Sequence, residues 1–112
     1  MPPQLDIELS QASGWSLIKA AGEIDLASVG QLEEAVEATL ASGARQVAID
    51  LTDITFLDST GLRALISAHT RLEETEGQLA VIIDGGPVER LFDITGMTST
   101  LHIHPSLESV TS

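Results

Sequence analysis

The chain has 112 residues, 43% of them apolar and 3% aromatic, and a formal net charge of −12 from 17 acidic and 5 basic residues. This size and composition fit one α/β domain with an aliphatic core, while the charge excludes the basic footprint that nucleic acids and anionic membrane surfaces require. Because the chain has no cysteine, it has no disulfide, thiolate nucleophile or cysteine-ligated zinc.

The first elements predicted are a β-hairpin and a helix. Residues 5–9 alternate apolar and polar side chains, which is typical of a half-buried strand. A Ser-Gly turn at 13–14 leads into a second strand over 15–20. The segment Gly22-Glu23-Ile24-Asp25 then enters a helix over about 27–40, whose apolar residues recur at helical spacing.

Two buried strands follow, each joined to the next by a helix. Residues 47–51 and 79–83 are continuously apolar or nearly so, which places both strands in the centre of a sheet. A short acidic loop after the first strand enters a helix over about 59–74. These strand-helix-strand units predict right-handed parallel crossovers.

The remaining sequence predicts a third helix after the turn at 85–87, a short last strand at 101–103 and a polar tail. The N-terminal residues 1–6 lack the basic and apolar regions of a secretory signal. The apolar runs are about one strand long, far short of the ~20 residues that span a bilayer. We therefore expect a soluble, cytoplasmic protein that does not bind membranes.

The most informative segment is Asp58-Ser59-Thr60-Gly61, at the start of the second predicted helix. Asp and Ser are common helix N-caps, so a purely structural role is one interpretation. However, Ser59 has no neighbouring base or cation to activate it as a nucleophile, and a helix N-terminus accommodates an anion. Gly61 costs helix stability and predicts a steric requirement, such as leaving Ser59 open to a docking protein. We therefore interpret Ser59 as a phosphorylation site.

Asp25 is a second candidate for the same surface. It follows a strand and can cap the next helix, but the ends of parallel strands gather on one rim of a sheet. Asp25 is therefore expected close to Ser59, where it would add to a negative field.

Other residues are weaker candidates for a functional site. His102 and His104 share one face of the predicted last strand, but a zinc site needs more ligands than the sequence offers nearby. His69 falls on the apolar stripe of its helix and is interpreted as a residue at the edge of the core whose polar atoms are satisfied. The pair Gly85-Gly86 lacks the Gly-Lys-Ser/Thr of a phosphate loop. We expect no metal, no cofactor and no catalytic activity.

These motifs resemble those of the anti-sigma-factor antagonists, the single-domain bacterial members of the STAS family. Asp50 to Leu62 is similar to the specific middle motif of that family, Gly22-Glu23-Ile24-Asp25 to a second motif and 91–97 to a third. The resemblance spans about residues 5–107, so the whole chain, 1–112, is identified as a single STAS domain. It implies an α/β fold with a mixed sheet of four or five strands packed against helices.

The resemblance also implies a function. The unmodified protein would bind an anti-sigma factor that is itself a serine kinase, which frees a sigma factor for transcription. Phosphorylation of Ser59 would end that binding, and a phosphatase acting on phospho-Ser59 would restore it. The partner-binding residues implied are Asp25, Asp58, Ser59, Thr60 and Gly61.

Two other functions fit the sequence less well. One is a STAS subunit of a larger assembly, such as a stress-sensing scaffold or a transporter accessory; co-purification with a large complex rather than a soluble kinase would indicate it. The other is a small nucleotide-binding protein, although no P-loop lysine and no Ser-His-Asp arrangement is recognisable.

Overall fold

The computed structural model describes residues 4–112, so the first residues of the segment interpreted as lacking a secretory signal lie outside the described part. The elements follow in chain order: β1 (Leu5–Ala12), β2 (Trp15–Ile24), α1 (Val29–Ala41), β3 (Gln46–Leu57), α2 (Ser59–Glu74), β4 (Gln78–Ile82), α3 (Gly86–Thr95), the 3-10 helix η1 (Met97–Ser99), β5 (His102–His104) and α4 (Leu107–Thr111).

The five strands form one sheet in the order β1-β2-β3-β4-β5. β1 and β2 are an antiparallel hairpin, whereas each of the other neighbouring pairs is parallel. This confirms the predicted α/β fold with a mixed sheet, including the parallel crossovers through the helices.

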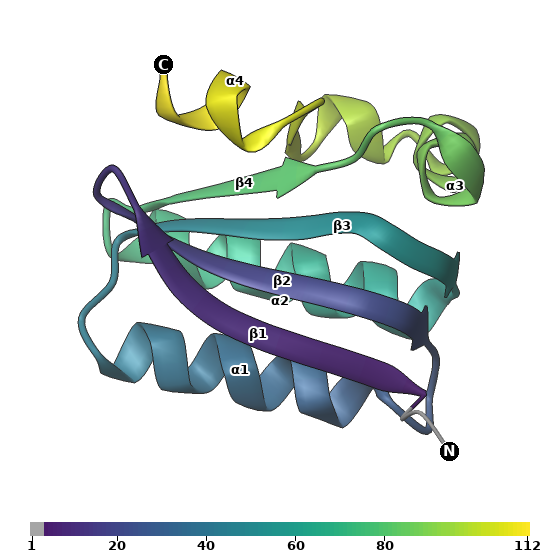
Figure 1. Cartoon of the computed structure of the whole chain (residues 1–112), viewed down its shortest axis with the longest axis horizontal. Helices are drawn as coiled ribbons and strands as arrows, with labels where there is room; N and C mark the ends of the chain where they lie inside the picture. The colour runs from purple at the N-terminus through teal and green to yellow at the C-terminus, as the bar shows by residue number, and fades with distance from the viewer. Residues whose placement is uncertain (1–3) are drawn as a thin grey trace.

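Helices α1 and α2 cover one face of the sheet (Figure 1). The main core lies between them and the sheet, and its fully buried side chains include Ile18, Leu32, Ile49, Leu65 and Phe92. The core is aliphatic, with Phe92 as its one buried aromatic residue in the described part of the chain. Within residues 4–112, no helix is long and apolar enough to cross a membrane.

A smaller cluster lies on the opposite face of the sheet. Ala48, Ala80 and Ile82 pack there against Val110 of α4, and Trp15 lies partly buried at the edge of the cluster. The sequence predicted a polar tail after β5, which is wrong for 107–111. The Ser106 hydroxyl accepts the Ser109 amide proton and caps this short helix, which buries Val110.

Strand β3 is longer than predicted. The acidic loop expected after residue 51 is part of the strand, which continues to Leu57 beside β2 with irregular register. The Asp50 carboxylate accepts the Thr52 backbone N–H at 2.9 Å, so the polar side chains satisfy the backbone where the ladder is interrupted. β2 likewise continues past residue 20 to Ile24.

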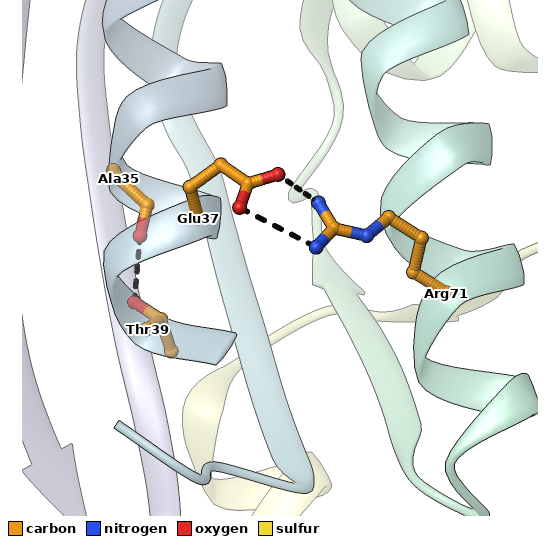
Figure 2. Close-up of polar contacts among 4 residues, drawn as sticks. All are labelled: Ala35, Glu37, Thr39 and Arg71. Atoms are coloured by element: carbon orange, nitrogen blue, oxygen red, sulfur yellow. Dashed lines mark hydrogen bonds and ion pairs between the residues drawn. The ribbon is translucent and has the colours of Figure 1, made fainter. Parts of the chain in front are cut away.

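Helices α1 and α2 are joined on their outer side by an ion pair between Glu37 and Arg71 (Figure 2). The guanidinium donates through both terminal nitrogens to the two carboxylate oxygens. Because both side chains are largely exposed, this pair contributes little to stability. The two helices are held mainly by the core beneath them.

Candidate functional site

The candidate site lies on the rim where β2 and β3 end together. Ile24 is the register partner of Leu57, and the Asp58 backbone N–H donates to the Ile24 carbonyl at 3.3 Å. Asp25 and Asp58 therefore leave the sheet on neighbouring strands. This is the gathering of strand ends that the sequence predicted for Asp25 and the Ser59 segment.

Asp58 is the N-cap of α2. Its Oδ1 accepts the backbone N–H of Thr60 at 3.0 Å and that of Gly61 at 3.4 Å, and it also accepts the Thr60 hydroxyl. These hydrogen bonds, the one from the Thr60 hydroxyl foremost, lower the pKa of Asp58 from its ordinary value of 3.8. The amide groups that the sequence suggested for an anion are therefore largely occupied by the carboxylate of Asp58.

Ser59 is the first residue of α2 and is exposed. Within the described part of the chain its hydroxyl makes no hydrogen bond, whereas the Thr60 hydroxyl beside it is held by Asp58. The two neighbouring hydroxyls thus differ in availability. Of the two, only the Ser59 side chain is both exposed and unengaged within the described residues.

Glycine is required at position 61 for a different reason from the expected one, which was to leave Ser59 open to a docking protein. Gly61 is buried, and a Cβ atom placed on it would lie 2.2 Å from Leu57 Cδ1 and 2.9 Å from Ile24 Cγ2. Gly61 therefore allows the first turn of α2 to pack closely on the paired ends of β2 and β3. The requirement for glycine at this position therefore comes from the core beneath the helix start.

Asp25 organises the turn between β2 and α1. Its carboxylate accepts the backbone N–H groups of Ala27 at 2.9 Å and of Ser28 at 3.2 Å, and it also accepts the Gln4 side-chain amide at 2.6 Å. Gly22 brings residue 4 close, because a Cβ on it would lie 2.2 Å from the Gln4 carbonyl oxygen. Asp25 is thus on the rim, with its carboxylate engaged by its own turn.

The histidines do not come together as a ligand set. His104 Nδ1 lies 2.9 Å from the Ser109 hydroxyl, while the ring of His102 stacks edge-on against His69 with centroids 6.0 Å apart. His69 is at the edge of the core, as predicted, and its Nε2 faces Glu73. The prediction that its polar atoms are satisfied is wrong for Nδ1, which is buried without a hydrogen-bond partner in the described part of the chain. Among residues 4–112, no group of three or more His, Cys, Asp or Glu side chains could hold a metal ion.

The fold and this rim define a small α/β domain that presents an exposed serine where a strand turns into a helix. The STAS domain family matches residues 6–110, and the chain belongs to that family. This confirms the resemblance found in the sequence motifs.

Several known proteins similar to this chain are anti-sigma factor antagonists. The anti-sigma-B factor antagonist of Staphylococcus aureus is 28% identical over 104 residues, which cover 93% of this chain and 96% of that protein. The crystal structure of an anti-sigma factor antagonist from Mycobacterium paratuberculosis has a TM-score of 0.87 at 28% identity, covering 95% of this chain and 90% of the other. The Bacillus cell fate determinant SpoIIAA in its phosphorylated form shares the fold, with a TM-score of 0.70 at 19% identity over 94% of this chain and 96% of the other.

Proposed function

We propose that this protein is a cytoplasmic anti-sigma factor antagonist that works by exchange of partners. In its unmodified form it binds an anti-sigma factor that is a serine kinase, and a sigma factor is released. The kinase uses its own ATP to phosphorylate Ser59, which ends the binding, and a phosphatase regenerates the unmodified protein. The antagonist needs no catalytic residue or cofactor of its own for this cycle.

The observation that carries this proposal is the exposed, unengaged hydroxyl of Ser59 on a rigid rim. Asp58 fixes the helix start, Gly61 lets α2 pack on the strand ends, and Asp25 fixes the adjacent turn. Such a surface is preorganised for docking, because little conformational entropy is lost when a partner binds it. The relatives at 28% identity are anti-sigma factor antagonists, which supports an anti-sigma factor as that partner.

The geometry also supports a way for phosphate to act. A phosphoserine carries about −1.5 to −2 charges. Because Asp58 already accepts the Thr60 and Gly61 amides, a phosphate on Ser59 would have to extend outward, toward the partner, with Asp58 and Asp25 nearby. The dianion would then oppose a surface shaped for a neutral hydroxyl, while the antagonist itself stays folded.

Phosphorylation by the cognate kinase tests the proposal. The protein incubated with that kinase and ATP is expected to gain one phosphate, located by fragment-ion mass spectrometry on Ser59. Ser59→Ala should gain none, and Thr60→Val is the control that should still be modified. A phosphate that persists in Ser59→Ala would contradict the assignment.

A further inference from the structure

Exposed apolar side chains occur on elements at the end of the sheet where Ser59 lies. The described residues include four large hydrophobic side chains that are mostly or half exposed: Leu26 at 79%, Ile94 at 77%, Leu9 at 54% and Phe56 at 47%. Leu26 lies in the turn after β2, Phe56 is two residues before Asp58 in β3, and Ile94 is in α3. Three of the four therefore belong to the elements that meet at the rim.

Leu26 is held outward by the turn that Asp25 organises. The Asp25 carboxylate and carbonyl accept amide protons from the residues that follow Leu26, among them Ser28 and Val29. The turn closes beneath Leu26, whose side chain remains in solvent. Because the hydrogen bonds come from backbone groups, they do not require leucine at this position.

Ile94 belongs to α3, the element that follows β4. β4 pairs with β3 only as far as Asp50, and α3 packs against the remainder of β3, where a strand would otherwise continue. Figure 1 shows α3 at the same end of the molecule as the ends of β2 and β3. The helix buries Val88 and Phe92, so Ile94 points away from the core.

The charge of the surface near Ser59 indicates the chemistry of the partner surface that binds it. Asp25, Asp58 and Asp93 lie on the rim elements, and Glu23 and Glu89 are also exposed there. The basic residues of the same elements are Lys19, Arg63, Arg71 and Arg90, of which Lys19 pairs with Asp53 and Arg71 with Glu37. Since the chain carries a net charge of −12, two copies would repel each other at this surface. A basic partner surface with apolar pockets is the complementary one.

We propose that Leu26 and Ile94, both exposed at the same end of the molecule as Ser59, are apolar anchors that dock into apolar pockets ringed by Lys and Arg on the anti-sigma factor kinase. This inference rests on the proposed function and adds to it which side chains supply affinity. The phosphorylation state of Ser59 decides whether the partner can bind, and the two anchors decide how tightly the unmodified form is held.

The binding test uses the purified kinase, defined as the serine kinase that the wild-type protein captures and that phosphorylates it. Leu26→Ala and Ile94→Ala are each expected to raise Kd by about tenfold or more, as apolar anchors at the centre of an interface do. Leu9→Ala is the matched control, because Leu9 pairs with Ile18 and lies roughly 20 Å along the sheet from Ile24. Its Kd should stay within about twofold of wild type.

The absence of cysteine from the chain allows a second readout that does not depend on affinity. Single cysteines at positions 26, 94 and 9 (L26C, I94C and L9C) can be labelled with a thiol reagent in the free protein. Saturating kinase should slow labelling at 26 and 94 and leave position 9 unaffected. All variants should keep the wild-type melting temperature, because the replaced side chains are exposed.

The outcomes separate this inference from the function on which it rests. If wild type binds the kinase and is phosphorylated while both alanine variants bind equally well, the anchors are wrong and the function stands. If no kinase binds the wild-type protein, both are wrong. A wild-type dimer that Leu26→Ala dissociates would show that a second copy, rather than the kinase, covers this surface.

Discussion

The two junctions at the rim of the sheet use the same residue type in different ways. After β2, Asp25 caps a turn, and α1 begins only at Val29. After β3, Asp58 caps α2 directly, and Ser59 is already the first helical residue. Each junction thus has an aspartate followed by a serine, but the intervening turn places the two serines in opposite environments.

Ser28 is buried, with 1% of its surface exposed, and both roles of its hydroxyl are used. It donates to the Glu23 carbonyl at 2.8 Å and accepts the Asp25 backbone N–H at 3.0 Å. Ser59 is exposed and its hydroxyl is not engaged within the described chain. At this rim, the spacing from the aspartate therefore decides whether the serine hydroxyl is used within the fold or is left unengaged.

The largest effect expected is on partner binding by Ser59→Glu. A fixed negative charge at this position, unpaired in the interface, should cost about 2–5 kcal/mol of binding free energy, or roughly 30- to several-thousand-fold in Kd. Calorimetric titration against the kinase measures it, and Ser59→Ala should bind like wild type. If Ser59→Glu bound normally, or lost binding only through unfolding, the difference between the two serines would not be functional.

The next effect is expected on stability, from Gly61→Ala. The added methyl group would overlap Leu57 and Ile24 in the core, so repacking should cost about 1–3 kcal/mol of unfolding free energy. Gly30→Ala is the matched control, because a Cβ there has no neighbour within 4 Å and the helix should gain about 0.5–1 kcal/mol. Denaturant titration compares both variants with wild type, and equal stabilities would refute the packing explanation.

Ser28→Ala should lower stability by about 1–2 kcal/mol, since it leaves the part-buried Glu23 carbonyl and Asp25 amide without their hydroxyl partner. The folded fraction should still bind the kinase with nearly wild-type Kd. Thermal unfolding together with titration separates these readouts. A Ser28→Ala variant with normal stability would mean that the Ser28 hydroxyl, like that of Ser59, does not stabilise the fold.

The smallest effect expected comes from Asp58→Asn, which keeps a capping oxygen and removes the charge. Because the folded-state pKa of Asp58 lies below 3.8, its carboxylate stabilises the protein above that pH, and this contribution is lost as the pH falls through the lowered pKa. The variant should therefore melt slightly below wild type at neutral pH. The difference should shrink when melting is measured below about pH 3.8; a constant difference would exclude the charge as its cause.

The sequence predicted much of the fold because its signals are strong and local. The alternation in β1, the apolar runs of β3 and β4 and the helical spacing of α1 and α2 each depend on one period of burial. The C-terminal half of β3 escaped prediction because the irregular pairing breaks the period of two, and Asp and Thr there resemble a loop. Helix α4 is five residues long, too short for a period to show.

The candidate site was predicted in part. The position of Ser59 and the proximity of Asp25 followed from the cap signal and from parallel topology. That Asp58 occupies the amide groups of Thr60 and Gly61, and that Gly61 faces Leu57, depends on atomic distances that no spacing of residues encodes. The exposure of Leu26 and Ile94 likewise requires the paths of the turn and of α3, which the sequence alone does not give.

The small cluster around Trp15 on the far side of the sheet has an experimental consequence. Trp15 begins β2, nine residues before Ile24 on the rim, which is roughly 30 Å along the strand. The chain has no other tryptophan and no tyrosine, so its intrinsic emission above 300 nm comes from this one indole. A spectral change on modification of Ser59 would therefore report movement transmitted through the sheet, and an unchanged spectrum would place the whole response at the rim.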